Sequence, residues 1–155
     1  MKVNEVMTRS VCVASPRMSI AKAAQMMADC DSGILPVGED DRLVGMITDR
    51  DIAIRAVARG KSHGTPVREV MSHEVLYCFD DEDIDEVARN MADQQVRRLP
   101  VVNRDKRLVG IVSLGDIANK DPDDSGEVAT SLADISSPSA PDRSGQPQAE
   151  KMVVR

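Results

Sequence analysis

The chain of 155 residues repeats itself, and this duplication limits its possible folds more than any other feature of the sequence. Residues 3–41 align with 67–105, and residues 42–53 align with 107–118 after one inserted residue near Lys106. Of the 51 aligned pairs, 21 are identical, which is far beyond what unrelated segments share. A unit of about 60 residues rarely buries enough surface to be stable alone, so we expect the two copies to pack on each other.

Each copy begins with the same order of predicted elements. Short runs rich in β-forming residues, 11–13 and 75–77, come first and predict strands. A helix follows in each copy, with apolar residues at i, i+3, i+4 and i+7. These apolar stripes are Ile20, Ala23, Ala24 and Met27 in the first copy and Ile84, Val87, Ala88 and Met91 in the second. Ser19 and Asp83 precede the stripes, where a side-chain oxygen can cap the helix.

Two further β-rich segments follow in each copy and predict a β-hairpin around a polar turn. They cover residues 34–37 and 43–47 in the first copy and 99–102 and 108–112 in the second. A second helix is predicted from near Asp51 to about Arg59. Its counterpart from Asp116 is expected to end before Pro122, because proline cannot continue a helix.

This pattern predicts an α/β fold of the α+β type, with two β-α-β-β-α repeats related by a pseudo-two-fold axis. We expect repeat 1 at residues 1–60, a linker at 61–66 and repeat 2 at 67–121. Residues 122–155 are rich in Ser, Pro, Asp and Gly, which predicts a flexible, mostly disordered acidic tail. One amphipathic helix carrying Val128, Leu132 and Ile135 remains an alternative within this tail.

Composition excludes several classes of function. The net charge of −6 and the pI of about 4.9 argue against binding to a nucleic-acid backbone. Aromatic residues make up 1% of the chain, so no stacking platform for bases is expected. Most of the negative charge lies in residues 121–155, which hold seven carboxylates and three basic side chains. No apolar run approaches the ~20 residues of a membrane span, and no signal peptide is evident, so we expect a cytoplasmic protein without a membrane partner.

The reactive side chains predict neither a metal centre nor a catalytic site. The cysteines Cys12, Cys30 and Cys78 are odd in number and never spaced C-x-x-C, so buried free thiols are expected rather than a disulfide framework. His63 and His73 have no partner at metal-ligand spacing. The sequence also shows no Ser-His-Asp or Cys-His arrangement and no P-loop, so we predict no catalytic residues, no metal and no required cofactor.

The repeated element with chemical content ends each hairpin, in the sequences GMITDRD and GIVSLGD. Each places a hydroxyl, Thr48 or Ser113, at the strand end and a carboxylate, Asp51 or Asp116, three residues later. A carboxylate there can accept two hydrogen bonds from the vicinal diol of a ribose, and the hydroxyl and free N–H groups can receive a phosphate. The alternative is that these residues only cap helices.

Taken together, the repeated motifs resemble a tandem pair of CBS domains, also called a Bateman module. The resemblance covers about residues 1–120 and rests on three motifs present in both copies. They are the V-x-E-V-M-[TS] start, the L-P-V strand and the G-h-h-[TS]-x-x-D-I end, where h is hydrophobic. The sequence TDRDIA of the first copy is similar to small stand-alone bacterial members without an attached enzyme.

This resemblance implies a sensor that binds adenosine-containing ligands in a cleft between the repeats, with the end-motif Asp at the ribose and the Thr or Ser near the phosphate. Each pocket is completed by the other repeat. Pocket A would comprise Thr48, Asp51, Val75, Tyr77, Arg97 and Arg98. Pocket B would comprise Ser113, Asp116, Val11, Val13, Ile34 and Arg50.

The arginines make the two expected pockets unequal. Arg97 and Arg98 in pocket A should favour AMP, ADP or ATP, because charge-assisted hydrogen bonds hold phosphate. Pocket B has only Arg50 and would be weak, empty or suited to a less charged compound such as S-adenosylmethionine. The alternative for the arginine pair is a solvated strand edge.

We therefore predict a non-catalytic regulatory module that binds adenine nucleotides. Two alternatives remain: a binder of another adenosine ligand, such as S-adenosylmethionine or NAD, and a ligand-independent dimeric interaction protein of the stress type. The resemblance also implies a homodimer formed through helices. The second helix offers an apolar surface for it, at Ile52, Ala53, Ala56 and Val57. The downstream protein partner is not indicated by the sequence.

Overall fold

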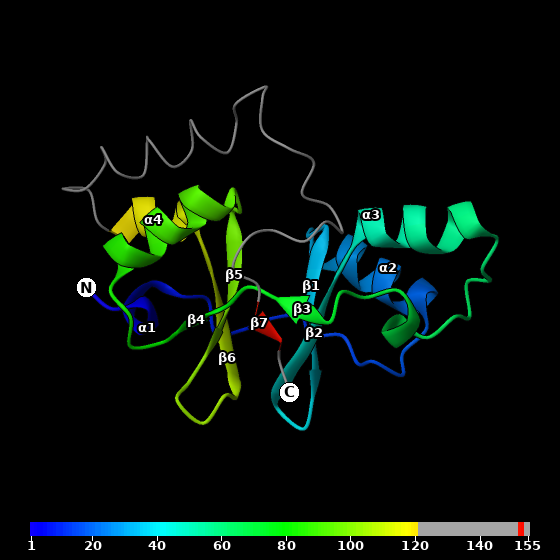
Figure 1. Cartoon of the computed structure of the whole chain (residues 1–155), viewed down its shortest axis with the longest axis horizontal. Coiled ribbons are helices and arrows are strands. Elements are labelled where there is room, and N and C mark those ends of the chain that lie inside the picture. Colours follow the sequence, from blue (N-terminus) through cyan, green and yellow to red (C-terminus); the bar gives the residue numbers. More distant parts are fainter. Residues whose placement is uncertain (121–151, 154–155) are drawn as a thin grey trace. The chain divides into compact units, whose positions relative to one another are not determined.

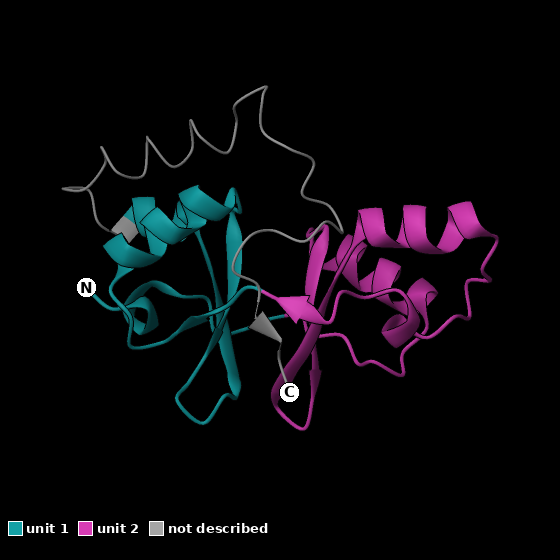
Figure 2. Ribbon diagram, viewed as in Figure 1, with its two compact units in different colours: residues 1–11, 76–143, 148–150 teal, residues 12–75, 144–147, 151–155 magenta. Residues whose placement is uncertain are grey.

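A computed structural model of the chain describes residues 1–120 and 152–153. These residues form two compact units (Figure 2). Unit 2 runs along the chain from Cys12 to Val75 and includes the strand β7 (Met152–Val153). Unit 1 combines Met1–Val11 with the described residues from Leu76 to Lys120.

Unit 2 contains the helix α2, a long hairpin, a second helical stretch that begins with α3, and further short elements (Figure 1). In chain order they are α2 (Ile20–Asp29), β1 (Ile34–Glu39), β2 (Arg42–Thr48), α3 (Asp49–Asp51), a π-helical turn η1 (Ile52–Ala56), the 3-10 turns η2 (Val57–Arg59) and η3 (Val67–Glu69), and β3 (Glu74–Val75). α3, η1 and η2 form one uninterrupted helical stretch, as predicted for the second helix. β3 pairs antiparallel with β7.

Unit 1 repeats this order with a more regular second helix. Its elements are α1 (Val3–Val6), β4 (Cys78–Phe79), α4 (Ile84–Gln94), β5 (Arg98–Val102), β6 (Leu108–Ser113) and α5 (Leu114–Lys120). β4, β5 and β6 make a three-stranded sheet in which β4 runs parallel to β5 and β6 runs antiparallel to it. The two repeats thus have the mixed α/β architecture predicted from the sequence.

The long helix of each unit begins at the predicted cap. The Ser19 hydroxyl accepts a hydrogen bond from the Lys22 N–H at 3.1 Å, and an Asp83 carboxylate oxygen accepts one from the Asp85 N–H at 2.9 Å. Such caps satisfy backbone donors that lack a partner inside the helix. The predicted apolar stripe of α4 is buried throughout, whereas in α2 one predicted member, Ala24, is exposed.

The hairpins also form as predicted. β1 and β2 pair antiparallel with Ile34 opposite Thr48, and the two-residue loop at Asp40 and Asp41 has positive φ at both positions. A type I′ turn requires this backbone, which Asp tolerates better than most residues. In the second copy the inserted residue, Lys106, takes a positive φ of 62° within a longer turn.

The core of each unit is completed by the first residues of the other sequence repeat. Val3 and Met7 pack in the unit 1 core, and Val67 and Met71 pack in the unit 2 core. The compact units therefore do not coincide with the sequence repeats.

The residue that follows each V-x-E-V-M motif is hydrogen-bonded to the second strand of a hairpin. Thr8 exchanges two backbone hydrogen bonds with Ile111 on β6, and Ser72 exchanges two with Met46 on β2. A Cβ at Gly110 would lie 2.7 Å from the Thr8 carbonyl oxygen, and one at Gly45 would lie 2.8 Å from the Ser72 carbonyl oxygen. The end-motif glycine of each repeat is therefore required by the close approach of the start motif.

The first strand predicted in each repeat is wrong in position. Residues 11–13 form no strand, and Leu76 and Tyr77 lie between β3 and β4. The pairing occurs just after the β-forming run, because Ala14 bridges to Val37 and Cys78 pairs with Val101. Here tertiary pairing overrides the local β-propensity.

The cysteine prediction is correct for one residue and wrong for two. Cys78 is free and buried. Cys12 and Cys30, expected as free thiols, are joined by a disulfide. The fold brings the first residue of unit 2 to the C-terminal end of α2, a long-range approach that cysteine spacing does not reveal.

The tail predictions lie almost entirely outside the described residues. The expected disorder of residues 122–155 and the alternative helix with Val128, Leu132 and Ile135 fall there, apart from β7. Within the part of the chain that the structure describes, no helix is long and apolar enough to cross a membrane.

Candidate functional site

The end motif of the first repeat folds into a reciprocal cap at the junction of β2 and α3. The Asp51 N–H donates to the Thr48 hydroxyl at 3.0 Å, and the Thr48 N–H donates to Oδ2 of Asp51 at 3.0 Å. The capping interpretation of these two residues is therefore correct, and it uses only one of the two carboxylate oxygens.

The second carboxylate oxygen of Asp51 is the unusual feature of this cap. Asp51 is 3% exposed, and its Oδ1 is buried without a hydrogen-bond donor. The Nε of Arg55 lies 3.7 Å away, which balances the charge without supplying a hydrogen bond. Since a buried acceptor without a donor is costly, Oδ1 is an acceptor that a ligand hydroxyl could satisfy.

The second repeat carries the same cap between β6 and α5. The Asp116 N–H donates to the Ser113 hydroxyl at 3.0 Å, and the Ser113 N–H donates to Oδ2 of Asp116 at 2.9 Å. Asp116 is half-buried rather than buried. Lys120 stands where Arg55 stands in the first repeat, and its side chain lies outside the description.

In unit 2, the backbone beside the Thr48–Asp51 cap comes from the residues before β1. Ile34 lies opposite Thr48 in the hairpin, and the Gly33 carbonyl accepts a hydrogen bond from the Asp49 N–H at 2.9 Å. A Cβ at position 33 would lie 2.7 Å from a carboxylate oxygen of Asp49, whose exposed side chain would have to move aside. The cap and the start of β1 are thus one tightly fitted corner.

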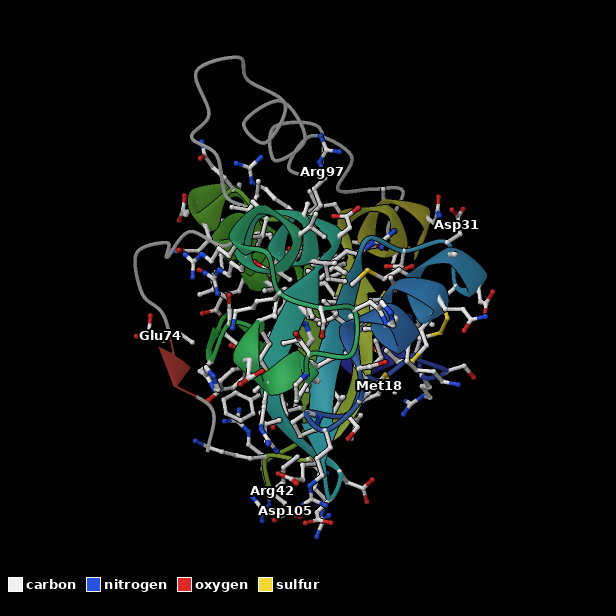
Figure 3. The ribbon with its side chains drawn as sticks, turned by 90° about the vertical axis from the view of Figure 1, so that its right-hand side faces the viewer. Met18, Asp31, Arg42, Glu74, Arg97 and Asp105 are labelled. Atoms are coloured by element: carbon white, nitrogen blue, oxygen red, sulfur yellow. A yellow bond between two sulfur atoms is a disulfide. The ribbon has the colours of Figure 1, made fainter. Side chains whose placement is uncertain are left out.

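In unit 1 the corresponding corner carries the arginine pair. Arg98 lies opposite Ser113, and the Arg97 carbonyl accepts a hydrogen bond from the Leu114 N–H at 3.1 Å. Both arginine side chains are exposed, and Figure 3 labels Arg97. The pair is therefore placed at a strand end next to a candidate site, not buried in the core.

The residues of each predicted pocket are divided between the two units. Unit 2 holds Thr48, Asp51, Val75, Val13, Ile34 and Arg50, and unit 1 holds Tyr77, Arg97, Arg98, Ser113, Asp116 and Val11. Val13 is 37% exposed and Val75 is 2% exposed. Each unit brings together one hydroxyl–carboxylate cap, whereas the combination of residues into pockets A and B stays a prediction.

The acidic run after β4 has structural partners. Asp83 caps α4, and the Glu82 carboxylate accepts a hydrogen bond from the Phe79 N–H at 2.7 Å. The Arg104 guanidinium donates to both carboxylate oxygens of Asp81, at 2.7 and 2.8 Å, and lies 4.1 Å from the centre of the Phe79 ring. Hydrogen bonds from Arg104 lower the pKa of Asp81, and the Asp85 N–H lowers the pKa of Asp83.

The Arg104 contacts are the part of this surface that sequence reasoning missed. Asp81 and Arg104 are 23 residues apart, so no local spacing indicates their pairing. Tyr77 adds an edge-to-face contact with Phe79, at 5.7 Å between ring centres. Among the described residues, no group of three or more His, Cys, Asp or Glu side chains could hold a metal ion.

Each unit contains a hairpin that ends in a hydroxyl–carboxylate cap and is hydrogen-bonded to a V-x-E-V-M-[TS] segment, so the two units are copies of one α/β module. The CBS domain family matches this chain twice, at residues 3–57 and 67–123. The chain therefore belongs to the CBS-domain family, as a tandem pair.

Three similar proteins illustrate the family. The CBS domain-containing protein YhcV of Bacillus subtilis is 44% identical over 116 residues, which cover 75% of this chain and 82% of YhcV. The CBS domain pair of protein MJ0100, solved with 5′-methylthioadenosine and S-adenosyl-L-methionine, is 32% identical with a TM-score of 0.66, covering 77% of this chain and 94% of that one. CBSX2, solved with AMP, is 28% identical with a TM-score of 0.67, covering 76% and 93%.

Proposed function

We propose that this chain is a non-catalytic sensor that binds an adenosine-containing ligand, with its ribose held by the carboxylate of an end motif. The observation that carries the proposal is the Oδ1 atom of Asp51, a buried acceptor without a hydrogen-bond donor. The 2′- and 3′-hydroxyls of a ribose are neighbouring donors of the kind this atom lacks. Because the cap holds the other oxygen, the carboxylate is already oriented before a ligand arrives.

The related structures support the same ligand class. One relative was solved with AMP, and the other with 5′-methylthioadenosine and S-adenosyl-L-methionine. These three compounds share an adenosine group and differ in charge at the 5′ position. We therefore propose the adenosine group as the common requirement and the 5′ substituent as the source of specificity.

The arginine pair is proposed to supply that specificity. Arg97 and Arg98 would bind the phosphates of AMP, ADP or ATP in pocket A, together with Thr48 and Asp51. Two guanidinium groups give more charge-assisted hydrogen bonds to phosphate than Arg50 alone can give in pocket B. Pocket B would then be weaker, or selective for a less charged ligand such as S-adenosylmethionine.

Calorimetry with AMP, ATP and S-adenosylmethionine tests this function. Asp51→Asn keeps an acceptor for the cap but removes the charge, and it should weaken nucleotide binding about 10- to 100-fold, because a hydrogen bond to a charged group contributes about 1.5–3 kcal/mol. Asp29→Asn, the same change at an exposed aspartate of unit 2, is the matched control and should leave affinity unchanged.

Two further outcomes decide the details. Arg97→Ala with Arg98→Ala should weaken AMP and ATP while leaving S-adenosylmethionine unaffected. If Asp116→Ala alone abolishes nucleotide binding and Asp51→Ala does not, the proposed order of the pockets is wrong. A protein whose thermal stability is unchanged by millimolar AMP, ATP, S-adenosylmethionine and NAD binds none of them, since a ligand of the native state must raise stability.

The second candidate function is a ligand-independent dimer that acts through protein contacts. It is favoured by exposed apolar side chains on the helical stretch after Asp51, where Ile54 is 49% and Val57 is 67% exposed. The surface predicted from sequence needs correction, because Ala56 is fully buried and Ile54 is exposed in its place. Light scattering compares the oligomeric state of Val57→Glu with that of the unchanged protein. If the variant is still a dimer, or if both proteins are monomers, this helix is not the dimer interface.

A further inference from the structure

The Cys12–Cys30 disulfide is in the same unit as the Thr48–Asp51 corner and has no part in the function proposed above. Cys12 is the first residue of unit 2, and Cys30 ends α2. Both cysteines are half-buried, so a small reductant can reach them. Cys78 differs, because it is buried in unit 1 and its burial raises the pKa of the thiol to about 12.

A short, well-defined path joins Cys30 to the candidate site. Asp31, labelled in Figure 3, takes a positive φ of 49°, and the next residue returns its N–H to the Met27 carbonyl at 3.0 Å. Gly33 then accepts the Asp49 N–H, and Ile34 lies opposite Thr48. Three residues along the chain therefore separate Cys30 from the carbonyl that is hydrogen-bonded to this corner.

Cys12 is connected to the same strand from the other side. Two residues after it, the Ala14 N–H donates to the Pro36 carbonyl, and the Ala14 carbonyl accepts from the Gly38 N–H, both at 2.9 Å. The disulfide therefore closes a ring that runs from Cys12 through Ala14 to β1, back along β1 to Gly33, and on to Cys30. Breaking the bond opens this ring, and the start of β1 is then held only by its hydrogen bonds and by the packing of Leu35 and Val37 in the core.

We propose that Cys12 and Cys30 form a reversible redox switch that sets the affinity of the Thr48–Asp51 site for its adenosine ligand. This inference rests on the proposed function and names the regulation of the same site. The oxidised form holds the corner in its binding geometry, and the reduced form binds more weakly because ligand binding must then order it.

The chemistry is thiol–disulfide exchange with a dithiol. One thiolate of the dithiol attacks a sulfur of the Cys12–Cys30 bond and forms a mixed disulfide, which the second thiol of the dithiol resolves. Two electrons pass to the cysteine pair, two protons complete its thiols, and the dithiol leaves as its own disulfide. A disulfide in the reducing cytoplasm, where we expect this protein, is usually transient and redox-sensing.

Calorimetry with AMP, before and after reduction by dithiothreitol, tests the switch on the full chain. Mass spectrometry with an alkylating reagent reports the state of the bond in each sample. We expect reduction to weaken AMP binding at least about fivefold, the lower end of usual coupling between sites. The double variant Cys12→Ser, Cys30→Ser should bind like the reduced protein with or without dithiothreitol, and Cys78→Ser should respond like the unchanged chain.

Equal AMP affinity in samples shown to be oxidised and reduced would overturn the proposal. So would a Cys12–Cys30 bond that persists in excess reduced glutathione, since such a bond is structural. Hydrogen exchange of the amides from Gly33 to Asp51 separates this failure from failure of the proposed function. If reduction makes exchange faster but AMP binds in neither state, the proposed ligand is wrong and the corner is still redox-sensitive. If reduction leaves exchange unchanged, the switch itself is wrong.

Discussion

Asp51 and Asp116 occupy the same position in two copies of one motif, yet their surroundings differ. Asp51 is buried beside Arg55, in the unit that contains the Cys12–Cys30 disulfide. Asp116 is half-buried in the unit that carries Arg97 and Arg98, without a disulfide among its described residues. Duplication preserved the hydrogen bonds of the cap, which depend on two side chains, while the residues around it diverged. The two sites are therefore chemically unequal, although the hairpin, the cap and the start motif around each of them are alike.

The largest expected effect tests whether the start motif packs equally closely against the end-motif glycine in both units. Gly110→Ala would place a Cβ 2.7 Å from the Thr8 carbonyl oxygen, and Gly45→Ala would place one 2.8 Å from the Ser72 carbonyl oxygen. Both should destabilise their own unit by about 3 kcal/mol, the upper end of usual overpacking costs, since a backbone atom cannot move aside as a side chain does. Hydrogen exchange in α2 and α4 measures the two units separately.

The control for these variants is Gly64→Ala, where a new Cβ would meet only a side-chain oxygen at 3.8 Å. It should leave the exchange rates in both helices unchanged. A Gly45→Ala protein as stable as the original would show that the start motif is not tightly held in unit 2. The packing of the start motif on the hairpin would then differ between the two units.

A smaller effect compares the caps themselves. Thr48→Ala and Ser113→Ala each remove one hydrogen bond from a helix start and should cost about 1 kcal/mol of stability. Nearly equal losses in denaturant unfolding would confirm that the caps are equivalent as structural elements. A much larger loss for Thr48→Ala would instead assign the buried Asp51 a structural role beyond capping.

The smallest effect is a pH dependence confined to unit 1. Hydrogen bonds from Arg104 lower the pKa of the Asp81 carboxyl, so its contribution to stability is present above the ordinary pKa of an aspartate. That contribution is lost as the pH falls below the ordinary value near 3.8 and through the lowered one. Because both groups are exposed, the change should be slight. Hydrogen exchange of the α4 amides, measured as the pH is lowered, checks this effect, with Asp81→Asn as the control. If the exchange of that variant depends on pH as in the unchanged protein, this ion pair is excluded as the cause.

Much of the fold follows from local rules that single-sequence reasoning uses. The capping oxygens of Ser19 and Asp83 precede apolar stripes, so both long helices could be predicted with their starting residues. The hairpins and their end caps follow from β-rich runs and from the three-residue spacing of Thr48 and Asp51. The pairing expected at 11–13 and 75–77 occurs instead just after these runs, because its position is set by the strands with which they pair elsewhere in the unit.

The sequence by itself determined the duplication, the order of elements, the family and the two hydroxyl–carboxylate caps, because each depends on residues close together in the chain. Only the tertiary structure decided that Cys12 meets Cys30, that Val3 completes the core of unit 1, and that Asp51 is buried. These features depend on which distant segments share one core, and hydrophobic burial, which drives that choice, is non-directional and leaves no local pattern.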